Sequence, residues 1–171
     1  MKEFLYKAFP GLRPTHELVK RNQAMFARLD QDYDLSEYGF VVVDTELTGL
    51  NPRRNEIVSI GAVRIKGMQV DPGETFYSLV RPDGDMPKNS TLIHRITPES
   101  VREAPTLDEV LPKFLQFVNG ALFVGHHVGL DIAFLNRAVR STLGGSLKTP
   151  CIDTLRLAQV LEAELWENYY D

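Results

Sequence analysis

Two carboxylates, Asp44 and Glu46, stand one residue apart where the apolar run 40–43 gives way to turn-forming residues. Such a run is typical of a strand buried on both faces, and open α/β sheets bind their ligands beyond the carboxyl ends of the strands. Residues two apart on a strand point to the same side, so both carboxylates can face one point. Hard oxygen ligands of this kind favour Mg²⁺ or Mn²⁺ over Zn²⁺. We therefore expect a divalent-metal site here; the alternative is a solvated turn or a helix cap.

A third carboxylate, Asp131, falls in the first turn of a predicted helix that follows a short apolar strand, 121–124. If that strand lies beside the first one and parallel to it, Asp131 reaches the same edge of the sheet as the first two carboxylates. Three acids would then converge. The alternative is that Asp131 only complements the dipole of its helix, an effect of about 0.3–1 kcal/mol, while His126 and His127 pair with backbone groups.

Hydrophobic periodicity and turn residues predict the elements that position these acids. The predicted strands are, in chain order, 40–44, 57–65, 74–80, 121–124 and 150–152. The predicted helices are 98–101, one opened by Pro105-Thr106 and running to 118, 130–139, and one that begins at Asp153 or Thr154. Short turns at Asn51-Pro52, Gly67 and Asp71–Gly73 join the first three strands. This order predicts an α/β fold: a mixed five-stranded sheet, antiparallel meander first and parallel strands after, flanked by helices.

Residues 1–38 have a different pattern from the rest of the chain. A helix from Thr15 to about Asp30 is predicted by an apolar stripe at Leu18, Met25, Phe26 and Leu29. We expect residues 1–38 to be an N-terminal helical extension packed on a single domain, 39–171. A partner-binding arm is the alternative.

Four segments together resemble one family, the DnaQ-like or DEDD-type 3′–5′ exonucleases typified by the epsilon subunit of bacterial DNA polymerase III. Val43–Leu50 with Asn55–Ala62 looks like the first motif of that family, and Ile93–Thr97 with Ala104-Pro105 resembles its I-H-G-I-T segment. Val124–Leu135 resembles the second motif, H-N-A-x-F-D-x-x-F-L, and Pro150–Ala158 is similar to a D-T-L-x-L-A junction. The resemblance covers about residues 39–162, in the family's order, and implies a ribonuclease H-like fold.

The sequence departs from the family pattern at several positions. Arg95 replaces a glycine, His127 an asparagine, Val128 an alanine and Leu130 a phenylalanine, while Leu47 stands where threonine is common. The first four are plausible variants, and the change at Leu47 would alter contacts to the terminal nucleotide.

A larger departure concerns the third motif of the family, H-x-x-x-x-D on a final helix, which supplies a general base and a fourth carboxylate. No histidine follows His127. Trp166 and Asp171 have the spacing of the histidine and aspartate of this motif, but indole cannot accept a proton as imidazole does. We expect a fragment of an exonuclease domain that ends before its last helix and is inactive or weakly active. A natural inactive relative is the alternative. Apolar surface at Leu155, Leu161 and Trp166 would then be uncovered and favour association.

For the complete enzyme, the resemblance implies two Mg²⁺ or Mn²⁺ ions about 3.5–4 Å apart that clamp the phosphodiester. Asp44 would bind both metals, Glu46 one of them and Asp131 the other, so these three are the candidate catalytic and metal-binding residues. The candidate substrate-binding residues are Thr48, Gly49, Leu50, His94, Thr97 and His126. For His94 the alternative is a turn residue that caps the following helix, and for His126 it is a contact that positions a carboxylate.

Composition restricts the partners. The net charge of −4 argues against a protein that coats nucleic acid, but a local basic rim could grip a strand end. The candidates for that rim are Arg53, Arg54, Lys88, Arg95, Arg137 and Lys148. We expect the 3′ end of single-stranded DNA or RNA, and a DNA polymerase subunit, as partners. No apolar segment approaches a membrane span or a signal peptide, so a cytoplasmic, membrane-free location is expected.

The lone cysteine, Cys151, excludes an intrachain disulfide and a thiolate zinc cluster built from this chain alone, and we expect it to pack within a strand. Three function classes remain open: a metal-dependent 3′–5′ exonuclease used in proofreading or trimming, a catalytically inactive nuclease-like module that binds nucleic acid or a polymerase, and a phosphotransferase. The absence of a G-x-x-x-x-G-K-[ST] loop disfavours the last.

Overall fold

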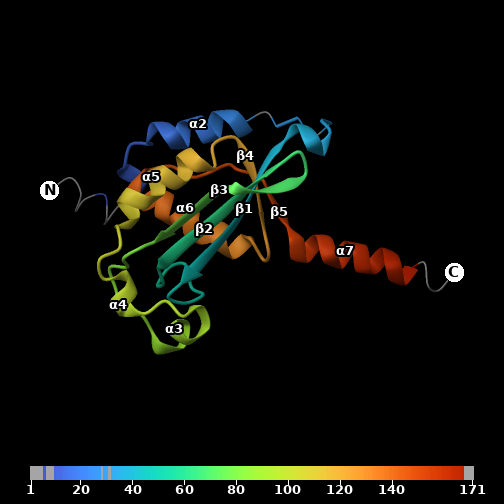
Figure 1. The fold of residues 1–171 in the computed structure, drawn as a ribbon. Helices are drawn as coiled ribbons and strands as arrows, with labels where there is room; N and C mark the ends of the chain where they lie inside the picture. The colour runs from blue at the N-terminus through green and yellow to red at the C-terminus, as the bar shows by residue number, and fades with distance from the viewer. Residues whose placement is uncertain (1–5, 7–9, 28, 31, 168–171) are drawn as a thin grey trace.

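A five-stranded sheet in the order β3-β2-β1-β4-β5 forms the centre of the computed structural model (Figure 1), which describes residues 6, 10–27, 29, 30 and 32–167. The strands are β1 (Gly39–Leu47), β2 (Ile57–Lys66), β3 (Gln69–Leu79), β4 (Ala121–Gly125) and β5 (Cys151–Asp153). The helices are η1 (Pro10–Leu12), α2 (Glu17–Phe26), η2 (Leu35–Glu37), α3 (Lys88–His94), α4 (Pro98–Val101), α5 (Leu107–Phe117), α6 (Gly129–Thr142) and α7 (Thr154–Glu167).

The central strand β1 joins two kinds of pairing. It is antiparallel to β2, which is antiparallel to β3, and it is parallel to β4, which is parallel to β5. The predicted mixed sheet, with a meander followed by parallel strands, is confirmed. The parallel pairing of β1 with β4 ends at Val42↔Val124, although β1 continues to Leu47. The carboxyl-terminal part of β1 therefore has no strand partner on that side.

The β2–β3 hairpin differs from its prediction. Gly67 and Met68 both have positive φ and form the turn, so β3 begins at Gln69 and includes Asp71–Gly73. The register jumps from Val63↔Thr75 to Arg64↔Asp71, so this segment is a bulge within β3 instead of the turn before it. A proline is tolerated there because β3 is an edge strand.

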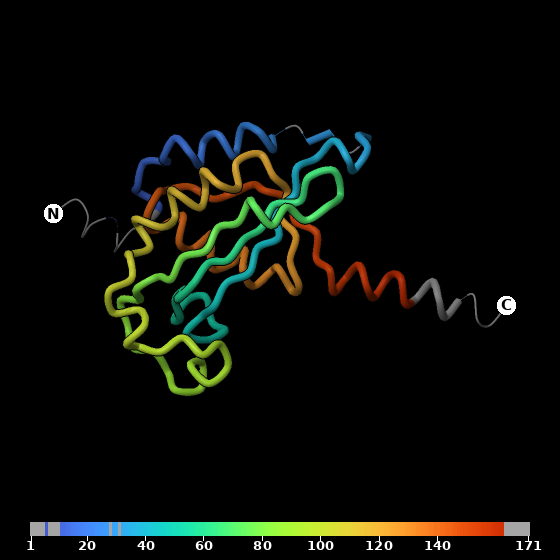
Figure 2. The backbone as a smooth tube through the Cα atoms, viewed as in Figure 1, coloured from blue at the N-terminus to red at the C-terminus, as the bar shows by residue number. Residues whose placement is uncertain are grey.

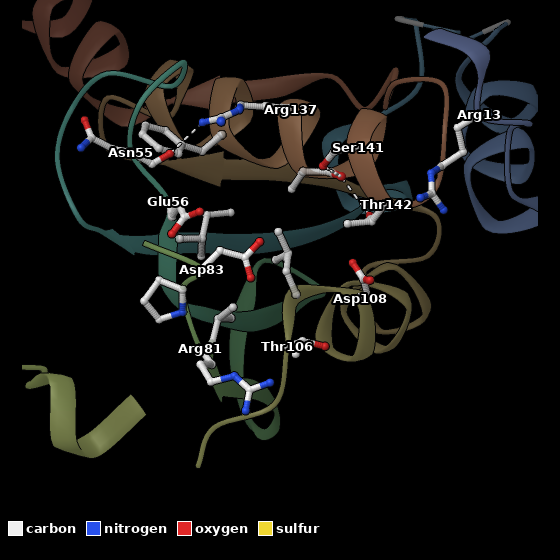
Figure 3. Close-up of a pocket in the computed structure, with 16 residues that line it drawn as sticks. Arg13, Asn55, Glu56, Arg81, Asp83, Thr106, Asp108, Arg137, Ser141 and Thr142 are labelled. Carbon is white, nitrogen blue, oxygen red and sulfur yellow. Dashed lines mark hydrogen bonds between the residues drawn. The ribbon is translucent and has the colours of Figure 1, made fainter. Parts of the chain in front are cut away.

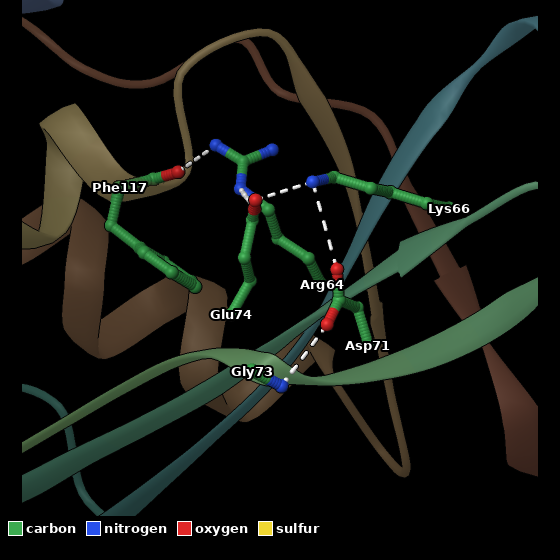
Figure 4. A network of polar contacts seen from close by, with 6 residues as sticks. All are labelled: Arg64, Lys66, Asp71, Gly73, Glu74 and Phe117. Atoms are coloured by element: carbon green, nitrogen blue, oxygen red, sulfur yellow. Dashed lines mark hydrogen bonds and ion pairs between the residues drawn. The ribbon is translucent and has the colours of Figure 1, made fainter.

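Charged side chains cross the outer end of this hairpin (Figure 4). Arg64 Nε lies 3.1 Å from Glu74 Oε2, and Lys66 Nζ contacts both Glu74 and Asp71. Arg64 also donates to the carbonyl oxygen of Phe117 at the end of α5. Exposed ion pairs contribute little to stability, so we interpret this network mainly as charge placed on a free sheet edge, which disfavours pairing with other chains.

The core lies between the sheet and helices α5 and α6. Phe114 of α5 stacks against Phe76 at a centroid distance of 5.7 Å and against Phe123 of β4 at 6.2 Å. Leu135 of α6 is fully buried in the same cluster. These contacts follow from the predicted apolar stripes of the two helices.

The N-terminal helix α2 packs on α5 and is shorter than predicted. It begins after His16, whose Nδ1 accepts a hydrogen bond from the Leu18 backbone N–H at 3.2 Å, so His16 and not Thr15 caps it. Its buried residue is Val19, which has no exposed surface, whereas Met25 of the predicted stripe is 45% exposed. Of the predicted stripe, Leu18 packs against the core and Phe26 is half-buried, so the stripe was right in part and missed Val19.

Two further expectations were wrong or incomplete. Helix α3 was not predicted, because it has no side-chain N-cap and its apolar residues Leu92 and Ile93 are exposed, so no amphipathic pattern marks it. Cys151 lies in β5 as expected but is exposed, because β5 is a short edge strand.

Helix α7 extends away from the rest of the molecule (Figure 2). Asp153 Oδ1 accepts a hydrogen bond from the Leu155 N–H at 3.0 Å, which confirms the predicted start of this helix. Leu161, as expected, is largely exposed, together with Leu157 and Val160. The side chain of Trp166, and all of Asp171, lie outside the described residues. Among the helices of the described residues, none is long and apolar enough to cross a membrane.

Candidate active site

The two carboxylates of β1 lie in the part of the strand that β4 does not cover. Asp44 is exposed and Glu46 is half-buried, while Val43, Thr45 and Leu47 between and beside them are buried. This alternation places the two acids on one side of the strand, as a period of two residues requires.

Asp131 reaches β1 through Thr45. Its Oδ1 accepts hydrogen bonds from the Thr45 backbone N–H at 2.9 Å and from Thr45 Oγ1 at 2.5 Å. Because β4 stops pairing at Val42, the Thr45 N–H lacks a strand partner, and a buried N–H must find another acceptor. The first turn of α6 supplies it. The structure thus brings a buried Asp131 to the residue between Asp44 and Glu46.

Burial and mutual repulsion raise the pKa of two of these carboxyls. The pKa of Glu46 is raised by burial first and by the charges of Asp44 and Asp131, against a smaller opposing effect of His94. The pKa of Asp131 is raised by burial and by Asp44, although the hydrogen bonds from Thr45 oppose the rise. The site therefore disfavours accumulated negative charge and would gain from a cation.

The chemistry of this donor set fits a hard divalent cation. Within the described part of the chain, the carboxylates of Asp44 and Glu46 have no hydrogen-bond or ion-pair partner, and Asp131 Oδ2 is not used by Thr45. As the described side chains stand, no three His, Cys, Asp or Glu side chains converge closely enough to enclose a metal ion. Loading would require rotation of the exposed Asp44 and half-buried Glu46 about their side-chain torsions, since Asp131 is fixed by Thr45.

The β1–β2 loop follows directly, and it carries three of the predicted substrate-binding residues. Thr48 is buried and closes the loop: its N–H donates to the Glu56 carbonyl at 2.9 Å and its Oγ1 accepts from the Glu56 N–H at 2.9 Å. Gly49 packs so tightly on Asn55 that a Cβ would lie 2.7 Å from Asn55 Oδ1. Leu50 is 77% exposed at the tip. Of these, only Leu50 presents a free side chain.

His94 and Thr97 end up in different surroundings. The His94 Nδ1 accepts a hydrogen bond from the Ile96 N–H at 3.0 Å, which leaves the proton of a neutral ring on Nε2. That Nε2 is buried without a hydrogen-bond partner in the structure, and the ring is close enough to Glu46 to influence its pKa. Thr97 instead forms the capping box of α4 with Ser100. His94 thus lies within electrostatic range of Glu46, whereas Thr97 is occupied as a helix cap.

His126 is not brought to the carboxylates. Its Nδ1 lies 3.2 Å from Thr154 Oγ1 at the start of α7, and its side chain is exposed. The neighbouring His127 has a positive φ of 58°, and its N–H donates to Asp153 Oδ1 at 3.0 Å. These contacts connect the end of β4 to the end of β5.

A cavity of about 420 Å³ lies behind the β1–β2 loop and not at the acids (Figure 3). Arg137 and Asn55 lie at one side of it and Arg81 and Thr106 at the other. None of Asp44, Glu46 and Asp131 lines it. Its walls carry both acidic and basic side chains, so it does not select a ligand of one charge.

Sequence reasoning missed the part played by Thr45. The residue was visible only as the middle letter of Asp-Thr-Glu, and the predicted strands 40–44 and 121–124 gave no sign that β1 continues past its parallel partner to Leu47. Arg137 was assigned to a basic rim, but it donates to backbone carbonyls of the β1–β2 loop.

The sheet is mixed, and its central strand β1 ends in two acids. A third acid, Asp131, reaches β1 from the helix that follows the parallel neighbour β4. This arrangement defines a ribonuclease H-like domain of the nuclease class. The sequence profile of the RNase T type exonuclease family matches residues 41–171, and the chain belongs to this exonuclease family. The resemblance to DnaQ-like exonucleases is thereby confirmed. Family membership supports a hydrolytic nuclease function.

Sequence relatives are replication proteins. The chain is 37% identical over 120 residues to the DNA polymerase III subunit epsilon of Aquifex aeolicus, covering 70% of the chain and 58% of that protein. It is 35% identical over 144 residues to the PolC-type DNA polymerase III of Thermotoga maritima, covering 84% of the chain. The chain spans only 10% of the length of that polymerase.

Solved exonuclease structures share the fold. Exonuclease I superposes with a TM-score of 0.62 at 17% identity, over 72% of this chain and 30% of that one. Exonuclease X, solved in complex with 5′ overhanging duplex DNA, gives a TM-score of 0.55 at 27% identity, over 71% of this chain and 63% of that one. The sheet order and flanking helices of the chain are therefore those of known exonucleases.

Proposed function

We propose that this chain is a divalent-metal-dependent exonuclease domain that hydrolyses phosphodiesters at the 3′ end of DNA, with RNA as a second substrate class. The observation that carries the proposal is the convergence of Asp131 on Thr45, between Asp44 and Glu46, with raised pKa values at Glu46 and Asp131. The polarity is supported by similarity to polymerase III epsilon, and a DNA strand by the DNA-bound exonucleases that share the fold.

Each residue has a task in this proposal. Asp44, Glu46 and Asp131 would hold two Mg²⁺ or Mn²⁺ ions, which would stabilise negative charge on the phosphoryl oxygens and lower the pKa of a bound water. Thr45 fixes the orientation of Asp131 through two hydrogen bonds. Leu50, exposed on the adjacent loop, would contact the terminal base, whereas the buried His94 Nε2–H could donate to substrate only after the ring moves.

A second candidate is a nuclease-like module that binds nucleic acid or a polymerase without cleavage. One observation favours it: two of the predicted substrate-binding residues, Thr97 and His126, make their hydrogen bonds away from the acids. In this case Thr97 and His126 would act only as structural residues, as their contacts to Ser100 and Thr154 suggest.

Release of mononucleotides from a single-stranded oligonucleotide in Mn²⁺ tests the two candidates. A 3′-labelled strand should lose its label as mononucleotide, while a 5′-labelled strand should shorten gradually. Asp44→Asn should lower the rate about 100-fold or more, because it removes a metal-binding charge. Asp85→Asn, an exposed aspartate outside the site, is the matched control and should retain the wild-type rate.

Oligonucleotide binding without release by the full-length protein would establish the binding module. Release that survives Asp44→Asn would contradict the assignment of the acidic site.

A further inference from the structure

Arg137, on the second half of α6, connects that helix to the β1–β2 loop. Its Nη1 donates to the carbonyl oxygen of Asn55 at 2.8 Å and also to the carbonyl oxygen of Pro52. Figure 3 shows the guanidinium beside Asn55, with the hydrogen bond drawn. We propose that Arg137 is a positioning residue that fixes the β1–β2 loop over the catalytic carboxylates and so sets the affinity for the terminal nucleotide. This inference rests on the proposed exonuclease function.

The loop is built so that its shape depends on few contacts. The Arg54 and Asn55 N–H groups both donate to the Asn51 carbonyl, and the Asn51 N–H donates to Asn55 Oδ1. These contacts form one compact turn, and the carbonyl oxygens of Pro52 and Asn55 within it accept from Arg137. Without Arg137 these two oxygens would have only water as a partner among the described contacts, because no other side chain is seen to reach them.

The position of this turn determines the position of Leu50 at the tip of the loop. Asn55 packs against Gly49 with no room for a Cβ, and Gly49 precedes the exposed Leu50. A shift of the turn therefore moves the backbone at Gly49 and the side chain at Leu50 together. Thr48, which closes the loop on Glu56, anchors the other end to β1 and β2.

One helix consequently controls both sides of the substrate site. Asp131, in the first turn of α6, bonds to Thr45, and Arg137 lies less than two turns further along the same helix. Since α6 is a rigid element packed into the core through Phe134, Leu135 and Val139, the separation between the carboxylates and the loop is fixed. A terminal nucleotide placed between them meets a preorganised site, which lowers the entropy cost of binding.

The experiment compares Arg137→Gln, Arg137→Lys and Arg140→Gln in the full chain. Arg140 is exposed on the same helix and makes no contact to the loop among the described residues, so its variant controls for lost charge. In Mn²⁺ with a 3′-labelled oligonucleotide, Arg137→Gln should raise KM about tenfold and leave kcat within about twofold, because the loop binds ground state and transition state alike. Arg137→Lys, which can still reach one carbonyl, should have a KM between those of the wild type and Arg137→Gln. Arg140→Gln should have the KM of the wild type.

Hydrogen exchange of peptides covering 48–56 gives a readout independent of catalysis. Arg137→Gln should speed exchange there and leave peptides of β1 and α5 unchanged. A purely structural role would lower kcat in proportion to folded protein with KM unchanged, and would overturn the proposal. So would an unaltered exchange rate in 48–56.

The two proposals fail differently. If the wild type releases no nucleotide, the proposed function fails. The affinity for a labelled oligonucleotide, measured by fluorescence anisotropy, then takes the place of KM. Equal affinities of the wild type and Arg137→Gln would overturn the positioning role. If the wild type is active and KM is unchanged in Arg137→Gln, the exonuclease stands and this inference falls.

Discussion

Thr45 shows how a single residue between two acids can determine an acidic site. Its backbone N–H lies beyond the last β1–β4 pair, and its hydroxyl doubles the contact to Asp131. Two hydrogen bonds to one carboxylate oxygen hold that acid in place while burial and Asp44 act against its ionisation. Burial and the charge of Asp44 thus oppose the ionisation of an acid that Thr45 holds in place.

Replacing the buried acid should stabilise the protein when no metal is present. In Asp131→Asn the amide oxygen can still accept both bonds from Thr45, but the charge disfavoured by burial and by Asp44 is gone. We expect Tm in EDTA at neutral pH to rise by about 2–4 °C, corresponding to about 1 kcal/mol in a chain of this size. Thermal unfolding followed by circular dichroism measures it, with Asp85→Asn as control. A lower Tm would show that the charge itself stabilises the fold.

The size of this difference should depend on pH with a definite sign. A carboxyl whose pKa is higher in the folded state binds its proton more tightly there, so it stabilises the fold at low pH and loses that contribution as pH rises through the raised pKa. Below the usual value of 3.8, Asp131 is neutral in both states. The Tm gap between Asp131→Asn and wild type should therefore be near zero at the acid end and reach its full size at neutral pH.

A titration of Tm against pH in EDTA, for both proteins, measures this gap. Saturating Mn²⁺ should reverse the order, because the metal stabilises only the protein that retains its ligands. A gap that is constant with pH would assign the effect to packing and not to charge.

At the residue scale, the sequence was informative where one spacing rule sufficed. Asp44 and Glu46 follow from the period of a strand, and Asp131 from the meeting of parallel strand ends. The surroundings of Thr48 and His126 could not be predicted, because a hydroxyl or imidazole at a strand end can bond in many directions. Which partner it finds depends on where Glu56 and Thr154 arrive from elsewhere in the chain.

At the scale of elements, α2 is joined to the rest of the domain by more than apolar contact. Asn22 receives a hydrogen bond from the Lys148 N–H at 2.8 Å and donates to Thr149 Oγ1 at 2.6 Å, and Gln23 donates to the Ser146 carbonyl at 2.8 Å. The segment it binds leads directly into β5. We infer that the N-terminal extension supports the edge of the sheet that bears the start of α7.

Truncation of the buried residue of α2 tests whether the extension unfolds together with the domain. Val19→Ala should lower the stability by about 2 kcal/mol, from lost apolar burial and the cavity left behind, and Tm by about 4–8 °C in one transition. Met25→Ala on the same helix, at a side chain 45% exposed, should change Tm much less. A separate early transition, seen by circular dichroism or calorimetry, would instead identify α2 as an independent arm.

Elements with a clear apolar period were predictable, and those without one were not. Helices α4, α5 and α6 follow from caps and stripes, and their bounds differ from the prediction by only a few residues. Helix α3 was not predicted because its apolar side chains face outward, and the first residues of β3 were missed because Asp71–Gly73 has the composition of a turn. In both cases tertiary pairing overrides the local signal.

For the whole molecule, the sheet order and the family were accessible from the sequence because four segments had to agree at once. Metal occupancy and the identity of the strand that is cut were not accessible in this way, since they depend on side-chain positions within an ångström or so. The chain also spans a minor part of the PolC-type relatives, 10% of their length in Thermotoga maritima, so partners of the whole protein are outside what this domain alone defines.

The early end of β1–β4 pairing has a consequence for how such a centre can vary. If β4 were extended so that its backbone reached Thr45, a carbonyl would take the N–H that Asp131 now accepts, and the acid would be displaced from the sheet. The position of Asp131 at the sheet thus exists because β1 continues beyond its pairing with β4. A residue inserted in β4 would move Asp131 away from Thr45 without replacing any acid. Changes in the outer strand β3 would leave Asp131 in place.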